Sequence, residues 1–224
     1  MNRNVLKIIA FVAMLIDHIG RVFFPENVIF CIIGRVSFPI FAFFIAEGYY
    51  YTRNKLRYVV MLVACLVVSW IPFVLLFDKS FFTANVIGVF TVAVLGMFII
   101  DGLKLKGKDD RFIYVLMFIT YCLFVIVCDF LSVIPEGFLG VLLVLSFYLF
   151  RGNTRVRLFA CSIILLLFGI VNHLNGWPYQ YFALIAIILI AFYNQQKGKY
   201  NLKYLFYVGY PLHLIVFLVL KLLF

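Results

Sequence analysis

A small set of ionisable side chains lies inside long apolar stretches of this sequence. In lipid, each such side chain costs on the order of a few kcal/mol unless it has a partner, so a residue kept there is a functional candidate. The types present are suited to proton transfer and to binding anions. The candidates are Asp17, His18, Arg35, Glu47, Asp129 and His213.

Asp17 and His18 are adjacent in one predicted helix. Adjacent helical residues point about 100° apart, so each needs a partner from another helix. One interpretation is structural, with neighbouring helices satisfying both side chains. The other is catalytic, because a neutral imidazole accepts a proton from an amine or hydroxyl near pH 7. In that case His18 is the general base, and Asp17 sets its tautomer or its electrostatic environment.

Arg35 lies in the segment 34–39, GRVSFP. A buried guanidinium needs a carboxylate, a phosphate or backbone carbonyls. A salt bridge to Asp17 or Asp129 and a clamp for an oxyanion or phosphate are equally good interpretations, and both can hold at once. Pro39 interrupts the helical hydrogen bonds and frees carbonyls for polar neighbours, which in membranes usually line a cavity.

Glu47 precedes three tyrosines and a basic segment with Arg53, Lys55 and Arg57. The ordinary interpretation is a carboxylate at the membrane interface, an aromatic belt and a cytoplasmic loop rich in positive charge. The alternative is that the basic segment holds the phosphates of a cytosolic cofactor. Both interpretations place this region at the inner edge of the membrane.

Two further candidates come later in the chain. Asp129 is an interface residue or the partner of Arg35, and His213 follows Gly209 and Pro211, which disturb a helix and allow close backbone approach. His213 is either bonded to a carbonyl or functional. His18 and His213 lack the spacing of a metal site and have no obvious third ligand, so we expect no metal.

The composition requires a membrane environment for these residues. Of 224 residues, 67% are hydrophobic and only 12% are charged, and the mean hydropathy is +1.15. A soluble domain of this size cannot bury so much apolar surface. A soluble enzyme, a disordered chain and a nucleic-acid-binding domain are therefore excluded, and the net charge of +10 indicates basic cytoplasmic loops. Five cysteines in apolar runs indicate packing residues rather than a disulfide framework.

We predict an all-α, polytopic transmembrane helix bundle forming one integral membrane domain over residues 1–224. Apolar runs near the bilayer length give about nine spans, of which 137–150 is short. The first span lacks a signal-peptide cleavage site, and we expect it to remain in the mature protein. The predicted spans are 5–25, 27–51, 56–77, 84–103, 112–134, 137–150, 155–172, 178–194 and 203–223.

The charges of the connecting segments alternate sharply. Most of the 19 basic residues fall at the start of the chain and after every second predicted span, whereas the intervening loops have very few. By the positive-inside rule the N-terminus is cytoplasmic and the protein is a multi-pass component of the cell membrane. The basic segments contain Arg3 and Lys7; Arg53, Lys55 and Arg57; Lys104, Lys106, Lys108 and Arg111; Arg151, Arg155 and Arg157; and Lys197, Lys199 and Lys203.

Several of these motifs resemble the TraX family, and the resemblance extends over nearly the whole chain. The N-terminal part is the most specific. The matching segments are 15–20 (LIDHIG), 34–43 (GRVSFPIFAF), 46–54 (AEGYYYTRN), 128–130 (CDF), 140–142 (GVL), 146–148 (SFY) and 210–214 (YPLHL).

The resemblance implies a catalytic role. The family is named for a conjugation-plasmid protein associated with pilin N-acetylation, and it is similar to polytopic acyltransferases that use an essential histidine in an early helix. By motif position that histidine is His18, accompanied by Asp17 and Arg35. The residues placed in substrate or cofactor binding are Glu47, Arg53, Asp129, Tyr210 and His213.

We therefore expect a membrane acyltransferase that moves an acetyl group from cytosolic acetyl-CoA to an amine or hydroxyl of an envelope, peptide or glycan acceptor. His18 is the general base and Arg35 stabilises the carbonyl oxygen. Membrane lipid surrounds the protein, and no nucleic acid partner is expected. The alternatives are a proton-coupled transporter using the buried carboxylates and a non-catalytic assembly factor in which polar residues join the helices.

Overall fold

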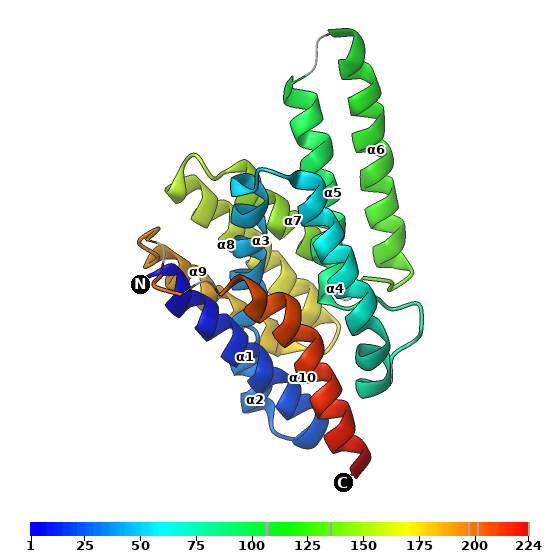
Figure 1. Cartoon of the computed structure of the whole chain (residues 1–224), viewed down its shortest axis with the longest axis vertical. Coiled ribbons are helices and arrows are strands. Elements are labelled where there is room, and N and C mark those ends of the chain that lie inside the picture. Colours follow the sequence, from blue (N-terminus) through cyan, green and yellow to red (C-terminus); the bar gives the residue numbers. More distant parts are fainter. Residues whose placement is uncertain (106–107, 135, 197, 201, 224) are drawn as a thin grey trace.

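The described residues of the computed structural model form helices and no strands, which confirms the all-α prediction for this part of the chain (Figure 1). The structure describes residues 1–105, 108–134, 136–196, 198–200 and 202–223. Lys106 and Lys197, two of the basic residues considered above, lie outside them. The helices are α1 (Arg3–Phe23), α2 (Val28–Gly34), α3 (Ser37–Tyr51), α4 (Lys55–Leu76), α5 (Val86–Leu105), α6 (Lys108–Phe130), α7 (Gly137–Leu149), α8 (Thr154–Leu174), the 3₁₀ helix η1 (Pro178–Leu184), α9 (Ile185–Ala191) and α10 (Lys203–Leu223).

The second predicted span is broken into α2 and α3, and the break lies at Arg35 and Val36. Pro39 is in the first turn of α3, where a missing backbone N–H costs little. Its ring is incompatible with the helical carbonyl of the residue four positions earlier, which is Arg35. The proline therefore ends the preceding helix upstream of itself and leaves Arg35 at a bend.

Within the described residues, six segments are long and apolar enough to cross a membrane. Three of the predicted spans, α1, α7 and the combined η1 and α9, are not among these six segments. The 21 residues of α1 include several charged side chains, whereas α7 and the combined η1 and α9 are short. The six segments are Val28–Tyr51, Lys55–Leu76, Val86–Leu103, Phe112–Phe130, Thr154–Leu174 and Phe206–Leu223.

Two charged side chains of α1 point into the protein, and part of its apolar surface points outward. Lys7 and Asp17 are only 9% and 6% exposed, whereas Val5, Ile8 and Val12 are about half exposed. Leu6 and Met14 are also buried, so the inward face combines apolar and charged side chains. This pattern differs from a helix on a soluble protein, whose buried stripe is apolar. It fits a helix whose outer surface contacts lipid and whose inner surface lines a polar interior.

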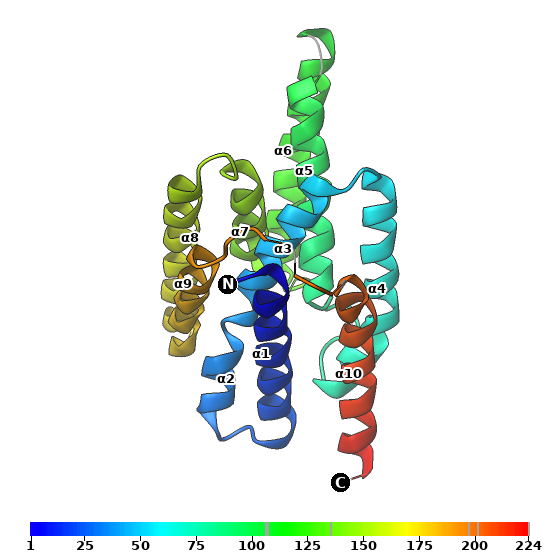
Figure 2. The same ribbon diagram turned by 60° about the vertical axis from the view of Figure 1, so that its left-hand side comes forward.

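The short helix α7 lies in the middle of the bundle, packed against α3, α5, α6 and α8 (Figures 1 and 2). Most of its side chains are buried, including Leu143, Val144 and Phe147. A helix that is apolar on all sides is typical of such a central position. Because neighbouring helices surround α7, its length need not match the thickness of the bilayer.

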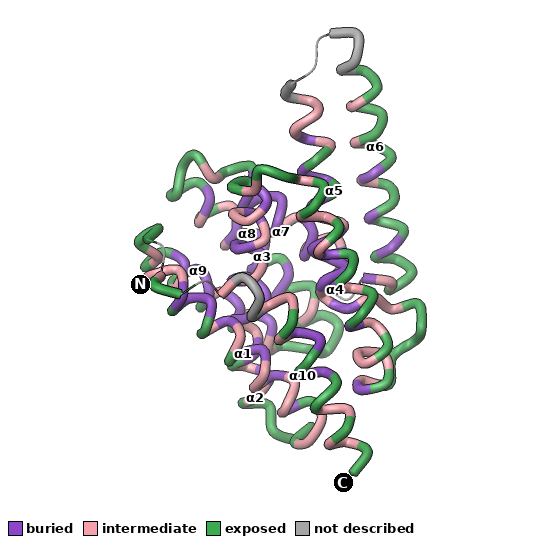
Figure 3. Tube along the Cα trace, in the orientation of Figure 1, coloured by how far each residue is buried: buried purple, intermediate pink, exposed green. Residues whose placement is uncertain are grey.

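The outermost helices expose apolar side chains along most of their length, shown in green on α4 and α6 in Figure 3. Phe112, Leu123 and Phe130 of α6 are 74%, 58% and 87% exposed. An apolar surface this large marks contact with lipid rather than water. The finding supports a membrane protein.

The connections alternate between two ends of the bundle (Figure 2). The start of α1, the loops 52–54 and 150–153 and the start of α10 share one end, which we call the basic end because Arg53, Arg151 and Arg155 lie there. The loops 24–27, 77–85 and 175–177 and residues 131–134 share the other, the opposite end.

Two groups of ionic contacts join helices near the basic end. Glu47 of α3 accepts a hydrogen bond from Arg157 of α8 at 3.1 Å. Asp101 of α5 accepts from Tyr49, from Tyr148 and, at 3.5 Å, from Lys55. These contacts join α3 to α8, and α5 to α3, α4 and α7.

Candidate active site

A polar cavity of about 600 Å³ opens toward the opposite end of the bundle. Its walls come from α1, α3, α10 and the segments that connect helices at that end. It brings together several candidates that are far apart in the sequence. These are Asp17, His18, Arg35, Asp129 and Tyr210.

Asp17 holds two arginines at the cavity wall. Its Oδ1 accepts from Arg35 Nη2 at 2.7 Å, and its Oδ2 accepts from Arg21 Nε at 2.8 Å. Arg35 also donates through Nη1 to Gln180 Oε1 at 3.1 Å and through Nε to the Cys31 carbonyl at 3.3 Å. Three of its five N–H groups thus have acceptors among the described residues, which leaves capacity for a ligand oxygen.

This pairing changes the predicted role of Asp17. We expected Asp17 to set the tautomer of His18 or its electrostatic environment. In the structure both carboxylate oxygens are used by Arg21 and Arg35, so they do not set the tautomer through a hydrogen bond. The physical reason is the angular separation of adjacent helical residues, which turns Asp17 toward α2 and His18 toward α10. Of the two ion-pair partners considered for Arg35, the structure selects Asp17.

The orienting group for His18 is a second histidine. His18 Nδ1 lies 2.7 Å from His213 Nε2, and His213 Nδ1 lies 3.1 Å from the carbonyl of Gly209. Because a carbonyl only accepts, His213 Nδ1 carries the proton and its Nε2 is an acceptor. His18 then donates from Nδ1, and its Nε2 has the free lone pair that a general base requires.

Tyr210 stands beside this histidine pair. Its ring centroid lies 5.3 Å from that of His213 in an edge-to-face arrangement. The residue is 4% exposed, and among the described residues its hydroxyl has no hydrogen-bond partner. Because Tyr210 also lines the cavity, its hydroxyl is a candidate donor to an oxygen of a bound substrate.

Two further carboxylates, Asp129 and Glu136, line the cavity. Asp129 is exposed, lies at the end of α6 and approaches Gly137 so closely that a Cβ there would overlap its carboxylate. The φ of Gly137 is +56°, a second reason for glycine at this position. Glu136 also lines the cavity, and burial raises the pKa of its carboxyl, whereas Arg35 and Arg21 act to lower it. Both can meet a substrate entering from this end.

A close approach between α1 and α2 positions the Asp17–Arg35 pair. A Cβ added to Gly34 would overlap the side chain of Asp17. Gly34→Ala is therefore expected to move the carboxylate, lower stability by about 1–3 kcal/mol and reduce activity. Thermal unfolding in detergent measures the first effect. Gly152→Ala, where a Cβ would meet nothing within 4 Å, is the control, and equal behaviour of the two variants contradicts the prediction.

Two predicted binding residues lie elsewhere. Glu47 is paired with Arg157, and Arg53 is exposed in the loop before α4. Neither lines the polar cavity. His213 touches the site through His18 rather than through the cavity wall.

The sequence interpretation passed over Arg21, Gln180 and Glu136. Arg21 was not among the candidates, although its spacing of four from Asp17 is that of a helical ion pair. Gln180 is buried in η1, and no local pattern links it to Arg35. Among the described residues, no group of three or more potential metal ligands lies together.

The fold and cavity define an integral membrane helix bundle with a buried polar site, and the sequence comparisons place it in a family. The model of the TraX protein family matches residues 2–221, so the chain belongs to the TraX family. A probable fimbrial assembly protein FimC, serogroup H1, of Dichelobacter nodosus is 27% identical, with 96% of each chain covered.

A shorter match joins the chain to an uncharacterised protein, RP591, of Rickettsia prowazekii (strain Madrid E). The two are 38% identical over 86 residues, which are 38% of this chain and 32% of that protein. No solved structure matches the chain.

Proposed function

We propose that the protein is a membrane acyltransferase that moves an acyl group, with acetyl-CoA as donor, to an amine or hydroxyl acceptor. The observation that carries the proposal is the His18–His213 pair, which leaves His18 Nε2 as a base beside a polar cavity. Two donors stand nearby, Tyr210 and the incompletely used guanidinium of Arg35. A base and oxyanion donors around one cavity are the requirements of acyl transfer.

The residues have distinct roles in the proposed reaction. His18 Nε2 takes the proton of the acceptor as its nitrogen or oxygen forms a bond to the thioester carbonyl carbon. Tyr210 and Arg35 donate hydrogen bonds to the oxygen as it becomes negative, where the low dielectric strengthens their effect. The C–S bond then breaks, and the imidazolium of His18 returns the proton to the leaving thiolate. Asp17 holds Arg35 in place.

The orientation follows from charge. The basic end is proposed to be cytoplasmic by the positive-inside rule, which places the N-terminus inside the cell and the cavity mouth on the outer side of the cell membrane. We propose that α1, α7 and the η1–α9 segment also cross the membrane. With the six apolar spans, they give about nine crossings. The acceptor then enters from outside through the mouth near Asp129 and Glu136.

The acceptor is proposed to be a component of the cell envelope. The name of the Dichelobacter relative, a probable fimbrial assembly protein, supports a role in pilus assembly, with the amine of a pilus subunit as acceptor. A carboxylate-lined mouth suits an incoming ammonium group.

The test is release of coenzyme A thiol from acetyl-CoA by the purified full-length protein in nanodiscs, with envelope extract as the source of acceptor. Acceptor-dependent thiol release supports the proposal. Failure of every acyl-CoA to bind, together with Glu136- or Asp129-dependent solute flux in proteoliposomes, overturns it in favour of a transporter.

His213 is expected to act as a positioning residue. His213→Leu removes the acceptor for His18 Nδ1–H, and we expect turnover to fall by about 10–100-fold, a typical loss when the group orienting a base is removed. His213→Gln keeps an acceptor oxygen and is expected to recover part of that loss at equal melting temperature. The rate of thiol release measures both. Equal rates for the two variants would leave His213 with only a packing role.

A further inference from the structure

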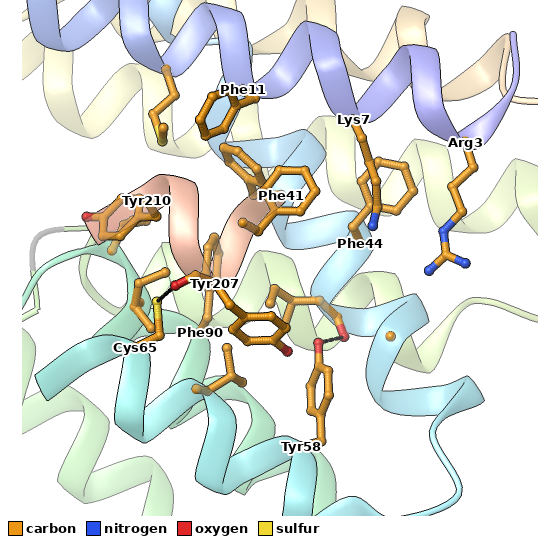
Figure 4. Close-up of a pocket in the computed structure, with 17 residues that line it drawn as sticks. Arg3, Lys7, Phe11, Phe41, Phe44, Tyr58, Cys65, Phe90, Tyr207 and Tyr210 are labelled. Carbon is orange, nitrogen blue, oxygen red and sulfur yellow. Dashed lines mark hydrogen bonds between the residues drawn. The ribbon is translucent and has the colours of Figure 1, made fainter. Parts of the chain in front are cut away.

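A second cavity lies along α1 toward the basic end. Its volume is about 180 Å³, and aromatic side chains of α1, α3, α4, α5 and α10 form much of its wall (Figure 4). The two cationic residues that line it are Arg3 and Lys7, one helical turn apart on α1. Figure 4 shows both side chains extending from α1 to the same side.

Lys7 is a buried cation without an anion. It is 9% exposed, and its Nζ lies 4.9 Å from the ring centroid of Phe206 and 5.4 Å from that of Phe44. Among the described residues neither Lys7 nor the guanidinium of Arg3 has a carboxylate partner. A buried, unpaired charge is costly. The half-buried Arg3 adds a second positive charge at the same cavity, and together they create a site that favours an anion.

The cavity continues toward the histidine pair. Met14, Phe41, Val86 and Tyr210 line both cavities, so the two cavities adjoin at these shared side chains. Along α1, Arg3, Lys7, Phe11, Met14, His18 and Arg21 follow one another every three or four residues and therefore occupy one face. From Lys7 to His18 the helix rises about 16 Å, a distance that a long, flexible arm can cover.

We propose that this second cavity, called the slot below, binds a phosphate group carried on a long, narrow arm. The phosphate lies at Arg3 and Lys7, and the arm is directed past Tyr210 toward His18. Resting on the proposed function, the arm is that of an acyl-CoA and presents its thioester beside the base. Phosphates on an arm also occur in phospholipids and polyprenyl phosphates, and the experiment separates these sources.

This site replaces the donor site predicted from the sequence. One interpretation of the sequence placed the phosphates of a cytosolic cofactor at the basic segment with Arg53, Lys55 and Arg57. In the structure Lys55 is already bound to Asp101 and to the carbonyl of Tyr49. Arg53 and Arg57 are exposed, and neither lines a cavity.

The test measures coenzyme A binding to the full-length protein in phosphatidylcholine nanodiscs. Lys7→Met and Arg3→Gln are each expected to weaken binding at least tenfold, with a matching rise in the KM for acetyl-CoA and a small change in kcat. Pantetheine, which lacks the phosphates, is expected to bind weakly and equally to all variants. Arg155→Gln, an exposed arginine at the same end, is the control. His18→Gln is expected to keep coenzyme A binding while losing turnover.

A second set of measurements tests lipids as the ligand. It uses phosphatidic acid and undecaprenyl phosphate as competitors. If one of them binds in a Lys7-dependent way and coenzyme A does not bind, the slot stands, its ligand is a lipid, and the donor of the proposed function is wrong. If coenzyme A binds independently of Lys7 and Arg3, the assignment of the slot as the phosphate site is wrong and the proposed function stands. Should Lys7→Met fail to fold, Lys7→Arg keeps the charge and must keep binding; loss of binding in a folded Lys7→Arg protein also counts against the slot.

Discussion

Replacing His18 by glutamine is expected to reduce acyl transfer by about 10²–10⁴-fold, the usual contribution of a general base. Glutamine can still donate a hydrogen bond to His213 Nε2, so the contact between α1 and α10 is retained. It has no basic lone pair near neutral pH and cannot take the proton of the acceptor. The initial rate of coenzyme A thiol release, measured with saturating acetyl-CoA, reports the loss.

The matched control is His173→Gln. His173 is exposed at the end of α8 and packs against the ring of Tyr181, so the same chemical change there should leave the rate within about twofold, because such surface changes are nearly neutral. Equal rates for His18→Gln and wild type, with both proteins folded, contradict general-base catalysis by His18.

Asp17→Asn is expected to lower the free energy of unfolding by about 3–5 kcal/mol, the usual cost of removing one partner of a buried ion pair. The asparagine is nearly the same size, so the loss comes from charge rather than packing. Arg35, whose side chain is 10% exposed, would keep its positive charge without its ion-pair partner. Unfolding by denaturing detergent, followed by circular dichroism, measures the change.

The double variant Asp17→Asn with Arg35→Gln is expected to recover part of that stability, because both buried charges are then absent. Activity should remain low, since the proposed oxyanion donor is gone. Asp78→Asn is the control, because Asp78 pairs with Lys221 at 2.6 Å but is 82% exposed, and exposed pairs contribute about 0–1 kcal/mol. If Asp17→Asn is no more harmful than Asp78→Asn, the buried pair does not stabilise the bundle.

Local patterns in the sequence predicted much of the helical framework. Apolar runs about as long as a bilayer core is thick require helices, because lipid offers no partner for backbone N–H and C=O groups. Pro39 predicted the interruption of the second span, and the structure has it a few residues upstream at Arg35. The small set of ionisable residues in apolar surroundings included four that line the polar cavity, Asp17, His18, Arg35 and Asp129.

The face of α1 that lines both cavities was also accessible from sequence. Arg3, Lys7, Met14 and His18 recur at helical spacing, but Arg3 and Lys7 were counted only as charges of a cytoplasmic segment. Burial of Lys7 distinguishes it from such a segment, and burial depends on Phe44 and Phe206 from distant helices. A periodicity test that included the charged residues would have connected them to His18.

The sequence alone indicated a membrane-embedded, helical chain and a small set of polar candidate residues. Hydropathy and helical periodicity are properties of short stretches of chain, so they can be read without the fold. Only the tertiary structure decided the partnerships. His18 meets His213 from 195 positions away, and Glu47 meets Arg157 across 110 positions. Such pairings depend on which helices become neighbours, and that is settled by packing of the whole bundle, because buried charges must find partners wherever the other helices supply them.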